Sequence, residues 1–350
     1  MTYHKHNTII FRSIAKPNIY IISIATEDYM ASQIYTDISS NTKGANILLI
    51  GSSGNIGGKA LELLLKQGKA ASITAFDKKA PKSSDLPSIV KVLSGDNADI
   101  TNPDAVKNGV RGNNIVVCAI GVPRYTAPGE KKLTPYEIEE NGMKNIIEAA
   151  KKEKVKQIIY ISALGVARGK DIPEFHHAHL AKQNAEKMLT KSGINYTILR
   201  PSGYFFDFRD LLAAAIAGRY HVVDEGMAQV QPLHQDDVAA ILVASINNKK
   251  AGKKIIPLGG PEIFTYNDLG KLFGKVLKKE IDIIRLAPDK FKKEYFNSDV
   301  ILFRARSNSI LTQKELDTLI ATYPGLKLKK LGDYLNNPKD PMLKNFFHQN

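Results

Sequence analysis

The chain has 350 residues, 43% hydrophobic and 24% charged, and this composition excludes an intrinsically disordered protein. Its single cysteine, Cys118, excludes a disulfide within the chain and indicates a reducing compartment, so we expect a cytoplasmic protein. The net charge of +14 comes without a nucleic-acid-reading motif or an apolar run of about 18 residues, so we expect a solvated basic surface, no nucleic-acid partner and no membrane span.

The first 44 residues show no sustained hydrophobic periodicity. We expect residues 1–44 to form a poorly ordered extension, within which Met30 is a second candidate translation start. Lys5, Arg12 and Lys16 precede the first acidic residue, as in a targeting peptide. We expect no secretory signal in these residues, because no uninterrupted apolar core is followed by a small-residue cleavage site.

The chemistry begins with a strand, a glycine turn and a helix in that order. The apolar run 45–50 meets a GxxGxxG turn, and a helical pattern follows. Such a crossover brings backbone N–H groups and the positive end of a helix dipole onto a diphosphate. The first glycine allows a tight turn, the second lets the backbone approach the phosphate, and the third lets helix and strand pack closely. We therefore predict dinucleotide contacts from Gly51, Ser53, Gly54, Asn55, Ile56 and Gly57.

An acidic residue ends the second predicted strand, 72–76. Asp77 follows Gly57 by 20 residues, a position where an acid commonly accepts hydrogen bonds from the adenosine ribose. A carboxylate there repels a 2′-phosphate and favours NAD. Lys78 could instead hold that phosphate, or it could be a solvated turn residue. We predict NAD or NADP as the cofactor, with NAD slightly favoured.

The alternation of strands and helices continues through predicted strands at 89–93, 114–120 and 157–162. Such alternation predicts an α/β fold, a Rossmann-type doubly wound parallel sheet, with ligands at the carboxyl ends of the strands. Asp96 and Asn97 follow the third strand and could reach the adenine. Further predicted cofactor contacts at strand ends are Ala119, Gly121, Ser162 and Pro201.

Two helix starts follow from capping residues. Thr134, with Pro135 after it and Glu137 at the third helical position, predicts a helix start. Asp236 and Asp237 precede an apolar helical pattern, so we interpret them as capping residues rather than catalytic ones.

As a set, these segments resemble the atypical short-chain dehydrogenase/reductases, specifically their NmrA-like NAD(P)-binding branch. The resemblance covers about residues 45–286, and its later half is most similar to reductases of the divinyl-chlorophyllide type and their relatives. The resemblance implies an NAD(P)-dependent oxidoreductase, but it does not specify a reaction. The matching stretches are 51–57, 141–150, 160–166, 181–186, 196–203, 237–239, 258–261 and 265–266.

The resemblance also implies catalytic residues. In the wider family a tyrosine donates a proton, and a lysine four residues later holds the nicotinamide ribose. Here Lys182 stands at the lysine position, but Ala178 replaces the tyrosine, which puts conventional carbonyl reduction in doubt. We expect Lys182 to bind ribose. The alternative is a surface lysine paired with Glu186, one turn further on.

Three other residues are candidates for the catalytic site. His179 shares a helix face with Lys182 and could supply the missing acid, although a solvated helix entrance is its default interpretation. Tyr204 is a second candidate donor or a structural ring, and Ser162 is a substrate contact or a plain strand-end hydroxyl. His176, His177 and His179 lie close in sequence, but no cysteine or acidic residue completes a metal-ligand spacing, so we expect no metal.

The predicted organisation has two parts besides the extension. Residues 45–202, completed by 231–260, form the NAD(P)-binding core, and residues 203–230 and 261–350 form a smaller substrate-side lobe. We expect hydride transfer to or from a small organic substrate at a C=O or a conjugated C=C bond. The alternative is a non-catalytic, dinucleotide-sensing regulatory protein. The sequence is also compatible with a homo-oligomer.

Overall fold

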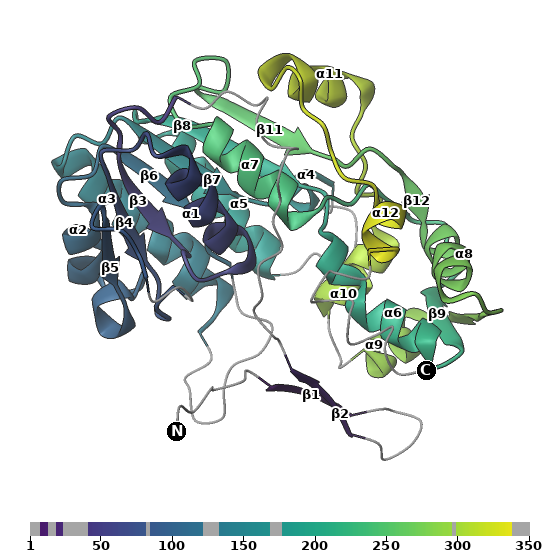
Figure 1. The fold of residues 1–350 in the computed structure, drawn as a ribbon. Coiled ribbons are helices and arrows are strands. Elements are labelled where there is room, and N and C mark those ends of the chain that lie inside the picture. Colours follow the sequence, from purple (N-terminus) through teal and green to yellow (C-terminus); the bar gives the residue numbers. More distant parts are fainter. Residues whose placement is uncertain are drawn as a thin grey trace.

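The computed structural model describes residues 8–12, 19–23, 41–81, 85–121, 133–168, 177–295 and 299–337. These residues form a sheet flanked by helices on both faces, with a second lobe beside it (Figure 1). The sheet lies at the left of Figure 1, and the lobe with α6, α8 and α9 lies at the right.

Seven parallel strands make the sheet, in the order β11-β8-β7-β6-β3-β4-β5. From β3 the chain moves outward through β4 and β5, then returns to place β6 on the other side of β3. This reversal is the switch point at which doubly wound folds bind ligands. The predicted doubly wound sheet is confirmed. The strands are β3 (Asn46–Ile50), β4 (Ser72–Phe76), β5 (Val90–Leu93), β6 (Ile115–Cys118), β7 (Gln157–Ile161), β8 (Asn195–Pro201) and β11 (Lys254–Leu258).

Alternate residues of the central strand enter different cores. Ile47 and Leu49 pack with α1 and α7, which lie side by side in front of the sheet in Figure 1. Leu48 and Ile50 pack with helices on the opposite face. Both faces of the sheet are therefore buried, as expected for an all-parallel sheet. The helices are α1 (Asn55–Gln67) and α7 (Gln235–Ala244) on the first face, and α2 (Pro103–Val110), α3 (Gly142–Lys152) and α5 (His177–Thr190) on the second.

The second lobe has its own apolar core, centred on aromatic side chains such as Tyr220, Phe273 and Phe291. Its strands are short: β9 (Arg219–Val223) pairs with β13 (Asp282–Leu286), and β10 (Gln229–Val230) pairs with β12 (Phe264–Thr265). Its helices are η3 (Phe205–Phe208), α6 (Arg209–Ile216), α8 (Tyr266–Leu277), α9 (Pro288–Glu294), α10 (Asp299–Arg306) and α12 (Leu331–Leu335).

Part of the predicted lobe packs against the sheet instead. Helix α11 (Gln313–Thr322) lies against β11, and Leu319 and Tyr323 belong to the core that contains α1 and α7. The assignment of all of residues 261–350 to the lobe is therefore wrong. Burial of Leu319 and Tyr323 against the sheet is favourable, and it places α11 there although the preceding helix belongs to the lobe.

The extension contains two strands that the sequence analysis did not predict. Strands β1 (Thr8–Arg12) and β2 (Ile19–Ser23) pair antiparallel. Both segments are rich in β-branched and aromatic residues, which suit a strand, but each is too short for a clear periodic signal.

Both predicted helix starts differ in detail from the expectation. The Thr134–Glu137 capping box is present, because each residue's side chain accepts a hydrogen bond from the other's backbone N–H at 3.2 and 2.8 Å. The first turns after it are π-helical, η2 (Tyr136–Asn141), and α3 follows. The N-cap of α7 is His234, one residue before the helix.

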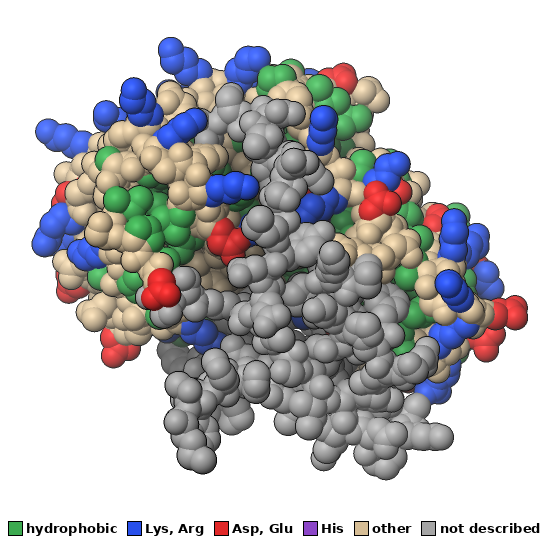
Figure 2. Space-filling view, viewed as in Figure 1, with side chains coloured by type: hydrophobic (Ala, Val, Ile, Leu, Met, Phe, Trp, Pro, Cys, Tyr) green, Lys and Arg blue, Asp and Glu red, His purple; other side chains and the backbone are tan. Residues whose placement is uncertain are grey.

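The face of the molecule shown in Figure 2 carries scattered rather than concentrated charge. On the face shown in Figure 2, Lys and Arg side chains are scattered over both halves, with acidic side chains between them. In the described part of the chain, no helix is both long and apolar enough to cross a membrane.

Candidate functional site

The glycine turn follows β3 at the switch point, and its shape depends on missing side chains. Gly51 has a φ of +84°, and a Cβ there would lie 2.6 Å from the Ala119 carbonyl oxygen. A Cβ on Gly57 would lie only 2.0 Å from the Gly51 carbonyl oxygen. Neither position has room for a side chain, so α1 can approach the strand end closely.

Gly54 has a different role in this turn. Its φ of −74° and ψ of 170° are open to any residue. Among the described residues, the one atom within 4 Å of a Cβ on Gly54 would be the Gly51 carbonyl oxygen, at 3.3 Å. This contact is close, but it is far less severe than those at Gly51 and Gly57, so the turn depends less on a glycine here. Among the described residues, the missing side chain leaves room beside the turn for a ligand.

The N-terminus of α1 faces this space. Its first turn carries no acidic residue, so no carboxylate of its own competes for the positive end of the helix dipole. Ser53 is half-buried and Asn55 is exposed, whereas Ile56 packs towards the apolar core. The main-chain N–H groups of the turn, rather than the Ile56 side chain, are thus the groups available to a diphosphate.

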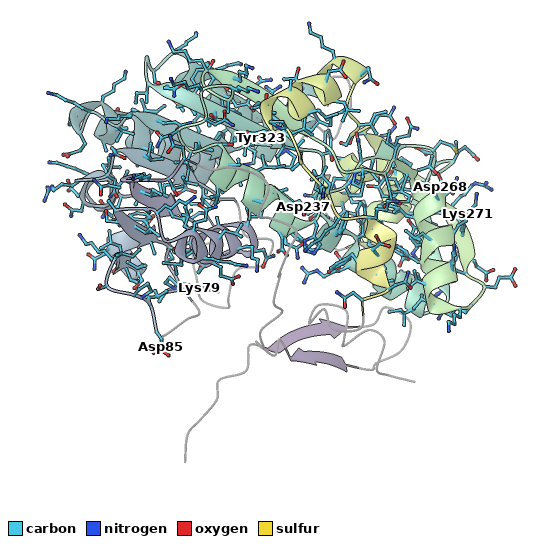
Figure 3. The ribbon with its side chains drawn as sticks, turned by 45° about the horizontal axis from the view of Figure 1, so that its top comes forward. Lys79, Asp85, Asp237, Asp268, Lys271 and Tyr323 are labelled. Atoms are coloured by element: carbon cyan, nitrogen blue, oxygen red, sulfur yellow. The ribbon has the colours of Figure 1, made fainter. Side chains whose placement is uncertain are left out.

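Asp77 is fixed beside the glycine turn. Its Oδ2 accepts a hydrogen bond from the Ser53 N–H at 3.0 Å, and its Oδ1 accepts one from the Lys79 N–H at 3.3 Å. Lys79 is labelled in Figure 3, beyond the end of β4. The carboxylate thus lies at the adenosine end of the predicted site.

The Lys78 side chain is 54% exposed and takes part in an ion pair. Its Nζ lies 2.8 Å from Asp99 Oδ2. Burial raises the pKa of Asp99, but hydrogen bonds from Lys78 and Thr101 outweigh it and hold this pKa below its usual value. Asp96 and Asn97 lie exposed in the 3₁₀ turn η1 (Gly95–Ala98) that follows β5.

Lys182 lies at the other end of the strand-end edge, in α5. Its Nζ donates to the Ile161 carbonyl oxygen at 3.1 Å and lies 2.8 Å from Glu139 Oε1. Its side chain is 14% exposed. The alternative of a surface lysine paired with Glu186 is wrong, because Glu186 forms two bonds to Arg200, at 2.9 and 2.5 Å.

The other predicted contacts at the strand ends are Ser162, Pro201, Gly121 and Ala119. Ser162 is buried directly after β7, and within the described residues its hydroxyl has no hydrogen-bond partner. A buried hydroxyl without a partner is destabilising, so one at this edge is suited to a ligand. Pro201 ends β8 and is buried, whereas Gly121, after β6, is exposed. Ala119 lies against Gly51.

His179 is buried rather than solvated, so the default interpretation of a solvated helix entrance is wrong. It is 9% exposed, and its ring centroid lies 4.4 Å from that of Phe303 in α10. A Cβ on Gly165, in the short helix α4 (Gly165–Arg168), would lie 2.6 Å from His179 Nε2. His177 is exposed, with Nδ1 3.1 Å from the Tyr136 hydroxyl, and His176 lies outside the described residues.

Tyr204 lies where β8 leads into the second lobe. Its ring stacks on Phe206 with centroids 4.8 Å apart. Burial raises the pKa of Tyr204, and the Asp207 carboxylate raises it further. The phenol is therefore protonated at neutral pH.

Asp236 and Asp237, at the start of α7, have structural roles. Asp237 Oδ2 accepts from the Lys329 N–H at 2.8 Å, and the Lys329 ammonium donates to Asp236 Oδ2 at 2.9 Å. His234 Nδ1 accepts from the Asp236 N–H at 3.2 Å. Asp237 lies between the sheet and the lobe (Figure 3), so this cluster ties the C-terminal segment to the start of α7.

The comparison with protein families agrees with this geometry. A model of NAD(P)H-binding proteins matches residues 51–249, which include the glycine turn, Asp77 and Lys182. The chain belongs to this NAD(P)H-binding family.

The relatives of this chain include a protein named as an enzyme. The chain is 28% identical over 230 residues to an uncharacterised chloroplast protein of Arabidopsis thaliana, covering 62% of this chain and 77% of that one. It is 26% identical over 277 residues to the divinyl chlorophyllide a 8-vinyl-reductase of the same plant, covering 75% of this chain and 66% of that one. The predicted resemblance is therefore confirmed.

A solved structure shares the fold. An NADPH-dependent quinone oxidoreductase of Escherichia coli, solved with NADPH, superposes with a TM-score of 0.62 at 21% identity, over 82% of this chain and 98% of that one. Three features of the described residues fit such a dinucleotide: the room beside Gly54, the acid-free first turn of α1, and the Ser162 hydroxyl, which has no partner among them. Among the described residues, no group of three or more His, Cys, Asp or Glu side chains could hold a metal ion.

Two buried residues of this site were not predicted from the sequence. Glu139 is 1% exposed, and its Oε2 accepts a hydrogen bond from the Tyr160 hydroxyl at 2.8 Å. The only local signal was the position of Glu139, four residues before Met143 on a helix face that is otherwise apolar. Cys118 lies near the pair, and burial raises the pKa of its thiol to about 12, so this thiol stays neutral.

Proposed function

We propose that the protein is an NAD(P)H-dependent reductase that transfers a hydride to a small organic substrate at a C=O or conjugated C=C bond. The glycine turn, at the N-terminus of α1 and the switch point of the sheet, carries this proposal, because the described residues leave room for a ligand beside Gly54. The reductase names among its relatives support it, and they do not favour the non-catalytic sensing alternative. When bound, the dinucleotide supplies the hydride.

The residues take roles along the edge of the sheet. Main-chain N–H groups of 51–57 hold the diphosphate, Asp77 holds the adenosine ribose, and Lys182 holds the nicotinamide ribose. The Ser162 hydroxyl orients the substrate or the nicotinamide. Each of these roles uses a group that lies at the carboxyl end of its strand or in the helix beside it.

The proton donor is Tyr204 in this proposal. Its neutral phenol lies at the start of the second lobe, under which we expect the substrate. His179 is packed between Gly165 and Phe303, so its ring has little freedom to approach a substrate. Water remains a second source, which suits the conjugated C=C reaction that needs no fixed acid beside the hydride acceptor.

The adenosine end favours NADH in this proposal. Asp77 is held at the ribose position, and Lys78 is bound to Asp99 rather than directed at a 2′-phosphate. The cytoplasmic location and a homo-oligomeric state stay predictions.

Calorimetry with NADH and NADPH tests the cofactor site. The wild-type protein should bind at least one of them, and Gly54→Val should abolish binding, because its side chain enters the ligand space while its backbone conformation stays allowed. Gly58→Ala is the matched control, since its Cβ would meet the Ser52 carbonyl oxygen at an ordinary 3.5 Å. No heat from the wild type with either dinucleotide would refute the proposal.

Turnover is tested separately with a panel of enones, quinones and aldehydes, following oxidation of the coenzyme. Consumption with any member supports the reductase. Tight coenzyme binding with no consumption across the panel would instead support the sensing protein.

A further inference from the structure

A buried carboxylate lies behind Lys182, and the cofactor roles above do not use it. Glu139 comes from the π-helical turn η2 and is 1% exposed. Its Oε1 lies 2.8 Å from Lys182 Nζ, and its Oε2 accepts the Tyr160 hydroxyl hydrogen bond at 2.8 Å. Both oxygens therefore have a polar neighbour, as a buried charge requires.

The ammonium of Lys182 is held from two directions. One N–H donates to the Ile161 carbonyl oxygen at 3.1 Å, and Glu139 lies 2.8 Å away. An ammonium has three N–H groups, so at least one remains for a ligand. Ile161 is the last residue of β7, so the Lys182 ammonium lies at the strand-end edge.

Fixing this side chain has a consequence for binding. A lysine has four rotatable side-chain bonds and loses much rotamer freedom when it holds a ligand. A side chain that is already fixed in the free protein loses less, so the ligand binds more tightly. π-Helical turns such as η2 are rare and often occur at functional sites.

We propose that Glu139 is a positioning residue: its carboxylate fixes the Lys182 ammonium for the nicotinamide ribose, and Tyr160 fixes that carboxylate. This inference rests on the proposed function. It assigns Glu139 no contact with the dinucleotide and no effect on the adenosine half of the site.

The test compares two ligands by calorimetry: whichever of NADH and NADPH binds wild type more tightly, and ADP, which reaches only the adenosine and diphosphate positions. Glu139→Gln should weaken dinucleotide binding about tenfold, the size expected for a lost charge-assisted contact. ADP binding should stay within about twofold, because the glycine turn is untouched. Glu139→Asp should recover part of the loss.

A double variant shows whether Glu139 acts through Lys182. On a Lys182→Met background, Glu139→Gln should cause no further loss of dinucleotide affinity. Glu148→Gln, an exposed position on α3, is the control for the same change of charge. Tyr160→Phe keeps the ion pair, so it should lower dinucleotide affinity less than Glu139→Gln does. It serves as a milder variant if Glu139→Gln does not fold.

Three results would overturn the inference. They are unchanged dinucleotide affinity in Glu139→Gln, an equal loss for ADP, and an equal loss on the Lys182→Met background. A wild-type protein that binds neither ADP nor the dinucleotide would instead refute the proposed function itself.

Discussion

The two ends of the site are built in different ways. At the glycine turn the structure depends on backbone, because Gly51 and Gly57 leave no room for a Cβ. At Lys182 it depends on side chains, because Glu139, Tyr160 and Lys182 come from three elements and meet in a buried cluster. At the first end, Gly51 and Gly57 have no room for a side chain. At the second, we expect the loss of one charge to leave its partner buried and unpaired.

The largest expected effect is at the backbone end. Gly57→Ala places a Cβ 2.0 Å from the Gly51 carbonyl oxygen, so the turn must shift. Overpacking of this kind lowers the free energy of unfolding by about 3 kcal/mol. The shifted turn no longer fits the diphosphate, so dinucleotide affinity should fall about 100-fold. Urea denaturation and calorimetry measure the two effects, with Gly58→Ala as the control. A Gly57→Ala protein that binds normally would contradict the role of backbone contact here.

The buried cluster around His234 extends the comparison. Burial keeps the His234 imidazole neutral, whereas Glu139 and Lys182 form an ion pair. Burial lowers the pKa of His234 to about 4, against about 6.5 in an unfolded chain. Between these values the unfolded state binds more protons, so the free energy of unfolding should fall by up to about 3 kcal/mol as the pH falls from about 6.5 to about 4.

His234→Asn tests this pH dependence. Asparagine keeps an acceptor for the Asp236 N–H but does not titrate in this range. Between pH 7 and pH 4.5, wild type should lose about 2 kcal/mol more stability than the variant in urea denaturation. Equal losses would show that His234 does not control acid stability.

The third prediction concerns the acid beside the glycine turn. Asp77→Asn keeps an acceptor for the Ser53 N–H but removes the charge that opposes a 2′-phosphate. The ratio of NADPH to NADH affinity should rise about tenfold, a change of about 1.4 kcal/mol. Asp85→Asn, an exposed position labelled in Figure 3, makes the same change of net charge and should leave the ratio unchanged. A similar shift in both variants would indicate a general charge effect.

The smallest effect is expected for an exposed ion pair that contrasts with Glu139 and Lys182. Lys271 Nζ lies 3.7 Å from Asp268 Oδ1, with side chains 73% and 49% exposed (Figure 3). Lys271→Ala should change the free energy of unfolding by less than about 0.5 kcal/mol. Hydrogen bonds from Thr265 are the main cause of the lowered pKa of Asp268, so Thr265→Ala should cost more, about 1 kcal/mol. Thermal denaturation ranks the two variants, and a larger loss for Lys271→Ala would contradict this reasoning.

The sequence predicted the sheet and the glycine turn because both depend on local signals. Apolar runs such as 46–50 and glycines at fixed spacing are visible within a short segment. The partner of Lys182 was missed because Glu139 lies 43 residues away, in a helix whose place against β7 no local pattern specifies. His179 was misjudged for the same reason, since Phe303, which covers it, comes from the second lobe.

The return of the chain to the sheet has a consequence for synthesis in the cell. The outermost strand, β11, is covered by α11, which leaves the ribosome only after every residue of the candidate site has been made. A message truncated before residue 313 would encode the whole site, yet it would yield a chain with the apolar side of β11 bare. We expect such a product to be taken up by chaperones or degraded rather than to accumulate.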